Sequence, residues 1–165
     1  MSGSSLYQTL LRTAHDFVLS TEPLPDTSPL SPSKDRILAH RTPDMLTTWG
    51  HKHFVAQTPP LQGAKTTDEF LSHMSMMLPS LENVRIQVVS VIVDEVQKKA
   101  AVVSMFYMTP KGEGDSESRT VENEVLWQLQ MTEDGGKVER AVEYVDPVAS
   151  KRIGELIGEW KKSQG

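Results

Sequence analysis

Two glutamates in the second half of the chain are the strongest candidates for acid/base chemistry. Glu143 shares one face of a predicted strand with Ala141 and Val145, so small and apolar side chains flank its carboxyl group. Glu124 lies on the strand predicted just before it. Two carboxylates on adjacent antiparallel strands can lie close enough to push their pKa values apart, which divides the roles of acid and base. The competing interpretation is that both are exposed charges on strand faces.

The orientation of Glu124 has two readings. Strict alternation places Glu124 on the face of Leu126 and opposite the more apolar face, which carries Asn123, Val125 and Trp127. Alternation alone therefore puts Glu124 outside. A curved sheet closed by a helix can bury both faces in its middle. Glu124 would then be a carboxyl group in an apolar pocket, with the raised pKa that suits proton transfer.

Three further polar side chains could assist this chemistry. Arg41 follows a predicted helix at the rim of the sheet, where a guanidinium can polarise a carbonyl, pair with an acid, or simply face solvent. His73 lies three residues after Phe70 on one face of a predicted helix, as a packed core group or as a catalyst. The Tyr107 hydroxyl is a candidate proton donor. Trp127 is a core residue unless a cavity opens beside it.

The sequence carries no motif for a metal, a nucleotide or a covalent nucleophile. It contains no cysteine, which excludes disulfides, thiolate zinc sites and cysteine nucleophiles. His51 and His53 would share a face of a strand, but a metal site needs a third ligand and an oriented second layer of contacts. No Gly-rich phosphate loop opens a helix, and no Gly-x-Ser-x-Gly turn is present. We therefore expect neither a metal nor a cofactor.

Composition narrows the class of partner. The chain has 165 residues, with 17 Lys and Arg against 22 Asp and Glu, for a net charge of −5. This balance argues against nucleic acid and against a polybasic membrane surface as partners. No stretch approaches the roughly 20 apolar residues of a membrane span, and no signal peptide is visible. We expect one cytoplasmic domain over residues 1–165 whose partner is a small hydrophobic molecule.

Helices dominate the first half of the predicted fold. Apolar residues at helical spacing predict a helix up to Ser20, followed by a Pro/Ser-rich loop at 21–32. A short helix is expected to begin at Ser31-Pro32 and to be interrupted by Pro43, with one further turn over 42–46. Residues 51–54 are predicted as a short strand. Thr66 and Glu69 have the spacing of a capping box, which opens a third helix.

Strands dominate the second half. Four segments rich in β-branched residues predict a long antiparallel meander over 84–145, and Asp146-Pro147 then starts a closing helix. Helices that come in a block before the strands imply an α+β layer fold. A curved sheet with helices across its concave face leaves a conical cavity, which is a natural small-molecule site. The acidic loop at 109–118 is expected to cover or narrow its entrance.

Four segments, in this order and spacing, resemble the NTF2-like superfamily, in particular the SnoaL-like proteins of fungal natural-product pathways. They are His-Arg-Thr-Pro-Asp at 40–44, the helix and turn at 70–83, Glu-Asn-Glu with Leu and Trp at 122–127, and the hairpin and strand at 134–146. The resemblance implies an NTF2-like cone-shaped α+β barrel with a deep pocket, and homodimers packed through the outer face of the sheet. It also implies acid/base residues on the pocket wall.

The residues that match such positions are Arg41, Asn123, Glu124 and Glu143. The resemblance places Glu124 toward the pocket, against strict alternation, and we expect it there. Glu143, Glu124 and Arg41 are thus the expected catalytic residues. The expected substrate-binding residues are Asn123, Tyr107, His73, Trp127 and Phe70.

The resemblance implies a cofactor-independent isomerase or cyclase acting on a small hydrophobic carbonyl metabolite. Glu143 or Glu124 would move a proton, while Arg41 would stabilise the developing enolate. One alternative is a non-catalytic module of the same fold that binds a ligand or a protein. Another is a dehydratase, which would pair an aspartate with a histidine such as His73. An enzyme should place at least two ionisable groups around a cavity that solvent can reach.

Overall fold

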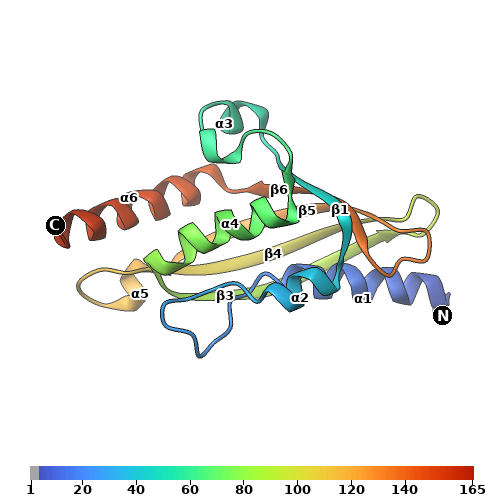
Figure 1. Ribbon diagram of the computed structural model, residues 1–165, viewed down its shortest axis with the longest axis horizontal. Helices are drawn as coiled ribbons and strands as arrows, with labels where there is room; N and C mark the ends of the chain where they lie inside the picture. The colour runs from blue at the N-terminus through green and yellow to red at the C-terminus, as the bar shows by residue number, and fades with distance from the viewer. Residues whose placement is uncertain (1–3) are drawn as a thin grey trace.

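A curved six-stranded sheet forms the centre of the computed structural model, which describes residues 4–165 (Figure 1). The strand order is β2-β1-β6-β5-β4-β3. The strands are β1 (Arg41–Trp49), β2 (Lys65–Thr66), β3 (Leu81–Asp94), β4 (Lys99–Pro110), β5 (Val121–Met131) and β6 (Val138–Val145). Strands β3 to β6 form the predicted antiparallel meander, whereas β1 pairs in parallel with β6. The sheet is therefore mixed, and β2 and β3 are its open edges.

Side-chain capping groups begin the three longest helices. The helices are α1 (Ser5–Leu19), α2 (Lys34–Ala39), α3 (Lys52–Ala56), α4 (Thr67–Met77), α5 (Ser116–Arg119) and α6 (Pro147–Ser163), with 3₁₀ turns at Pro59–Leu61 and Leu78–Ser80. The Ser4 side chain accepts from the first turn of α1, and Thr66 and Glu69 form the predicted capping box of α4. Asp146 accepts from two backbone amides at the start of α6. Within the described chain, no helix is both long and apolar enough to cross a membrane.

The segment between α2 and α4 differs from the prediction. Residues 41–49 form β1 instead of ending a helix and starting a further turn. Pro43 lies where the pairing of β1 with β6 is irregular, so its missing N–H interrupts no regular ladder. The predicted strand at 51–54 is wrong, because His51 has a left-handed backbone (φ 55°) and α3 follows it. The second helix begins at Lys34, two residues later than Pro32.

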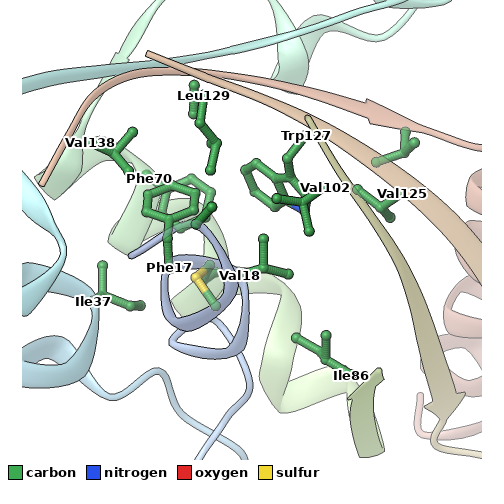
Figure 2. Close-up of a cluster of buried hydrophobic side chains, with 14 of the residues drawn as sticks. Phe17, Val18, Ile37, Phe70, Ile86, Val102, Val125, Trp127, Leu129 and Val138 are labelled. Atoms are coloured by element: carbon green, nitrogen blue, oxygen red, sulfur yellow. The ribbon is translucent and has the colours of Figure 1, made fainter. Parts of the chain in front are cut away.

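The hydrophobic core lies between the concave face of the sheet and the helices α1 and α4 (Figure 2). Phe17 of α1 meets Trp127 of β5 edge to face, with ring centroids 5.6 Å apart. Trp127 is opposed on β4 by Val102, and both are almost fully buried. Burial of such side chains contributes about 1.5–3 kcal/mol each, which holds α1 across the sheet.

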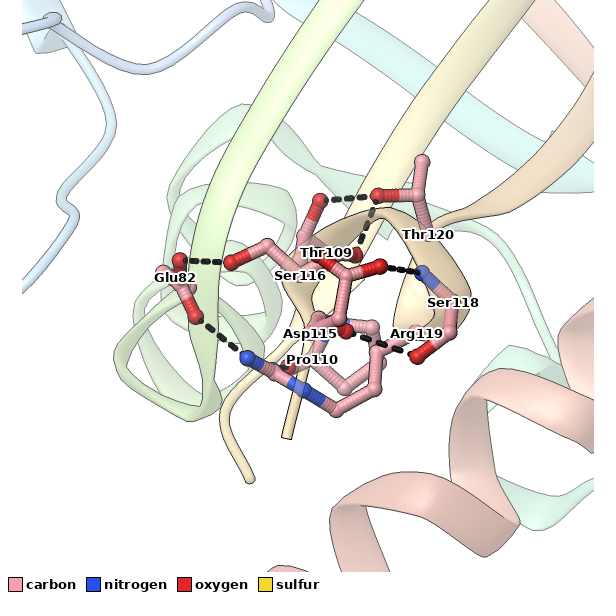
Figure 3. Close-up of polar contacts among 8 residues, drawn as sticks. All are labelled: Glu82, Thr109, Pro110, Asp115, Ser116, Ser118, Arg119 and Thr120. Carbon is pink, nitrogen blue, oxygen red and sulfur yellow. Dashed lines mark hydrogen bonds and ion pairs between the residues drawn. The ribbon is translucent and has the colours of Figure 1, made fainter. Parts of the chain in front are cut away.

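The connection between β4 and β5 is tied to the start of β3 (Figure 3). Arg119 forms an ion pair with Glu82 at 2.9 Å and donates to the carbonyl of Pro110. The Ser116 hydroxyl donates to the same carboxylate at 2.7 Å. These contacts hold the connection away from the cavity described below, and none of its residues lines that cavity. The expectation that the 109–118 loop covers the entrance is therefore wrong.

Candidate functional site

A cavity of about 1120 Å³ opens on the concave face of the sheet. Its floor comes from β1, β4, β5 and β6, and α4 forms one wall. The start of α6 and the segment 51–62, which contains α3 and one 3₁₀ turn, complete it. The lining is mainly apolar, with ionisable groups at Glu143, His73, His51, His53 and Lys151. The arrangement is that of a small-molecule site, in which a few polar groups orient an apolar ligand.

Glu143 lies on the floor of the cavity between two indole rings. It is directly paired with Trp49 on β1 and with Trp127 on β5, and directly opposed residues share one face of a sheet. Burial raises the pKa of Glu143 to about 7, while hydrogen bonding by Trp49 and the charge of Arg41 act in the opposite direction. Both the acid and the carboxylate are thus populated near neutral pH, which suits a group that removes and returns a proton.

His73 lies at the same end of the cavity as Glu143. It projects from α4, and its ring centroid is 5.6 Å from that of Trp49. Burial, followed by the charge of Lys65, lowers the pKa of His73 below its usual value. The imidazole is therefore neutral at pH 7 and has one N–H to donate. Phe70 stacks on Trp49 with centroids 6.4 Å apart and holds this wall in place.

Arg41 is buried behind the cavity wall and does not line the cavity. Only 2% of it is exposed, and its guanidinium lies between the rings of Phe17 (4.8 Å) and Phe70 (4.4 Å). It donates to the Thr47 hydroxyl at 3.2 Å, while Nε and Nη2 have no partner within residues 4–165. Burial lowers its pKa to about 10, and the charge of Glu143 raises it. Arg41 is therefore still protonated at neutral pH, and its positive charge acts electrostatically on groups in the cavity without contacting them.

Glu124 and Tyr107 lie on the opposite, convex face. Glu124 is exposed and pairs with Met105 of β4. The guanidinium carbon of Arg85 lies 4.0 Å from the ring centroid of Tyr107, and the Tyr107 hydroxyl donates to the side chain of Gln87 at 3.4 Å. Neither residue lines the cavity, so the expectation that both face it is wrong. Strict alternation along β5 predicted the orientation of Glu124 correctly, because the middle of this sheet buries one face only.

Asn123, Trp127 and Phe70 line the cavity as expected, but Asn123 also has a structural role. Its side-chain oxygen accepts from the backbone N–H of Asp146 at 3.0 Å, which fixes the junction of β6 and α6. Trp49 is a further site residue that was not predicted, because residues 41–49 were not expected to join the sheet. Strict alternation of Met45, Thr47 and Trp49 was the available signal.

Histidines at the rim do not assemble into a metal site. His51 stacks edge to face on Tyr144, with centroids 5.5 Å apart, and His53 hydrogen-bonds Gln57 at 3.0 Å. Across residues 4–165, no three His, Cys, Asp or Glu side chains gather closely enough to hold a metal ion.

Solved structures share this architecture at low sequence identity. The chain is similar to the BvnE pinacolase from Penicillium brevicompactum, with 16% identity and a TM-score of 0.74 over 96% of this chain and 97% of that one. A putative SnoaL-like polyketide cyclase from Jannaschia sp. CCS1 matches with 12% identity and a TM-score of 0.65 over 92% and 94%. An NTF2-like protein of unknown function from Burkholderia pseudomallei K96243 matches with 14% identity and a TM-score of 0.61 over 92% and 98%.

These structural similarities establish the fold of this chain. No family model and no curated protein matches the sequence. The chain has the NTF2-like, SnoaL-like α+β fold, with a sheet that is strongly curved but not closed. The fold class expected from the sequence is confirmed.

Proposed function

We propose that this protein is an isomerase or cyclase that moves a proton on an apolar, carbonyl-containing substrate, with Glu143 as the acid/base group. The observation that carries the proposal is the carboxyl group of Glu143 on the floor of an apolar cavity, with a pKa near neutral. It is the only carboxyl group among the described residues that line the cavity. The pinacolase and the putative polyketide cyclase of the same fold support this class of reaction.

The chemistry needs no external oxidant or reductant. The Glu143 carboxylate takes a proton from the carbon next to the substrate carbonyl, and the C–H electron pair forms the enolate. Protonated Glu143 then returns the proton to a different carbon, which isomerises the substrate. In a cyclisation, the enolate carbon instead attacks an electrophilic carbon of the same molecule, and Glu143 protonates the anion that results. A positioned acid/base group contributes roughly 10²–10⁴-fold to such a step.

His73 and Arg41 stabilise the negative charge on the enolate oxygen. The neutral imidazole of His73 donates its N–H to that oxygen, since it lies at the Glu143 end of the cavity. Arg41 contributes from behind Phe70 without touching the substrate. Because the lining is mainly apolar, both contributions are stronger than they would be in bulk water.

The size of the cavity favours a polycyclic substrate. Ligand pockets usually measure roughly 300–1,000 Å³, and about 1120 Å³ lies above that range. The aromatic rings of Trp49, Trp127 and Phe106 offer broad apolar surfaces for fused rings.

Exchange of substrate protons with deuterated water tests the proposal without knowledge of the natural substrate. The probe is androstanedione, a rigid apolar tetracycle with a ketone at each end. We expect the wild-type protein to accelerate deuterium incorporation next to a ketone, measured by mass spectrometry. Glu143→Gln should lose roughly 10²–10⁴-fold of that acceleration.

Glu124→Gln is the matched control, because Glu124 lies on the same sheet but on the convex face. It should exchange protons at the wild-type rate. Full activity of Glu143→Gln would overturn the catalytic role. Binding of the probe without any exchange would favour the ligand-binding alternative.

A further inference from the structure

Asn123 and Glu143 lie far apart on the cavity floor. Glu143 is paired with Trp127 on β5, and Asn123 precedes Trp127 by four residues on the same face of that strand. Four residues of a strand span roughly 13 Å. Both residues line the same cavity. An extended ligand can therefore place one end beside Glu143 and another part beside Asn123.

The floor between these two residues is apolar. Val125 and Val145 are paired directly across β5 and β6, and both line the cavity together with the ring of Trp127. On the other side, Asn123 is paired with Phe106 of β4. The part of a ligand that spans the two ends must be apolar, since it would lose its hydration without gaining hydrogen bonds.

The side-chain amide of Asn123 has a free donor. The residue is 5% exposed, and its oxygen is held by the backbone N–H of Asp146 at 3.0 Å. A backbone N–H can only donate, so this contact determines which amide atom is the oxygen. The amide nitrogen has no hydrogen-bond partner in the described part of the chain. This nitrogen is not among the fully buried atoms, and Asn123 lines the cavity, so an acceptor on a ligand that reaches it gains a hydrogen bond.

We propose that Asn123 binds an oxygen acceptor at the far end of the ligand and thereby sets the length of the molecules that the site selects. The inference rests on the proposed function in that it takes the cavity as the substrate site. The reacting carbonyl lies beside Glu143 and His73, and a second carbonyl, ester or lactone oxygen lies beside Asn123. The ligand class is an elongated, mainly apolar molecule with two oxygen functions roughly 10 Å apart, as the strand spacing requires.

Equilibrium binding of three ketones of one skeleton tests this assignment. The probes are androstanedione and the two androstanones that carry only one of its ketones. Ligand-dependent fluorescence is read from Trp49 and Trp127, which flank Glu143, in a Trp160→Phe background that removes the third tryptophan. We expect the diketone to bind about tenfold more tightly than either monoketone, which is the effect of one well-formed hydrogen bond.

Asn123→Asp is the diagnostic variant, because an aspartate can still accept from the Asp146 N–H but has no amide donor. At pH 8, where the aspartate is ionised and cannot donate, its preference for the diketone should fall to about onefold. Asn123→Ala, which also loses the acceptor, should show the same loss of preference and a lower thermal midpoint. An unchanged preference in Asn123→Asp would overturn the assignment. So would equal affinity of the wild type for all three ketones, or no binding of any.

Glu143→Gln separates this inference from the proposed function. If the inference is right, this variant keeps the diketone preference even where proton exchange is lost. If the wild type shows no exchange but its preference depends on Asn123, the catalytic proposal fails and the length selection stands.

Discussion

At the scale of single residues, the charge state of Glu143 is the property on which the site depends. Burial raises its pKa to about 7, whereas Trp49 and the cation of Arg41 both favour the carboxylate. Arg41 in turn is held as an unpaired cation between two phenylalanine rings, where no described carboxylate reaches it as an ion pair. Two opposing effects therefore set the pKa of Glu143: burial in an apolar cavity raises it, and the charge of Arg41 behind the cavity wall lowers it.

Removal of the Arg41 charge should raise the pKa of Glu143 further. In ¹³C NMR titrations of the glutamate carboxyl groups, we expect one resonance with a midpoint near pH 7 in the wild type, absent in Glu143→Gln. The midpoint should move upward in Arg41→Met and stay near the wild-type value in Arg41→Lys, which keeps the charge. A downward shift in Arg41→Met would contradict this electrostatic account.

Neutralising Glu143 should stabilise the protein at high pH. The folded-state pKa of about 7 exceeds the ordinary value of 4.5, so the folded state binds the proton more tightly between these values. The contribution of this group to stability is therefore full below pH 4.5 and declines as the pH rises toward 7.

Glu143→Gln removes that decline. Its thermal midpoint should exceed that of the wild type at pH 8, and the difference should shrink at pH 5. Glu124→Gln, on the exposed face, should show no such pH-dependent gain. A wild type more stable than Glu143→Gln at pH 8 would show that the ionised form of Glu143 does not destabilise the fold.

At the scale of elements, the junction of β1 and α3 positions the segment 51–62 over the cavity. Gly50 donates to the Glu143 carbonyl at 2.8 Å, and a Cβ on Gly50 would lie 2.0 Å from the ring of Tyr144. That ring also contacts His51, whose left-handed backbone turns the chain into α3. Tyr144 is thus the support against which this junction packs.

Gly50→Ala should displace Tyr144 or the segment 51–62. We expect a loss of about 1–3 kcal/mol in the free energy of unfolding, as for other overpacked sites, together with weaker binding of androstanedione. Gly158→Ala is the control, since its Cβ would meet open space on α6 and an alanine there should stabilise the helix by roughly 0.5–1 kcal/mol. Chemical denaturation of both variants measures the difference, and equal stability of the two would contradict the role of Gly50.

At the scale of the whole molecule, the cavity occupies the concave face of the sheet and leaves the convex face to other contacts. Leu126 on β5 lies between Val103 of β4 and Tyr144 of β6 on this face. Ile92 of β3 is 72% exposed beside them. Contiguous apolar side chains of this kind are typical of surfaces that bind another protein. Association of two copies of the chain through this face, which the resemblance implies, stays a prediction.

A charged side chain at the centre of the convex face should prevent two copies of the chain from associating. We expect light scattering after size-exclusion chromatography to give the mass of a dimer for the wild type and of a monomer for Leu126→Glu. Gln164→Glu adds the same charge at the C-terminal end of α6, outside the sheet, and should remain a dimer. A monomeric wild type would refute the association.

Much of this architecture was predictable from local patterns. The Thr66–Glu69 box and Asp146 are capping signals that act within one turn of chain, and each begins a helix as expected. Alternation along β5 placed Trp127 on the more apolar face of that strand. Alternation also placed Glu124 on the opposite face, where the structure has it. The resemblance had placed Glu124 toward the pocket, and that expectation was wrong.

Long-range pairing decided the rest. Residues 41–49 are a strand because they hydrogen-bond with β6 and β2, which lie far away in the sequence, and a local pattern interrupted by Pro43 does not show this. That single pairing brings Trp49 beside Glu143 and draws Arg41 into the core between Phe17 and Phe70. The types of the reactive groups follow from the sequence, but their protonation does not. Protonation depends on burial and on charges from distant segments, which exist only in the folded chain.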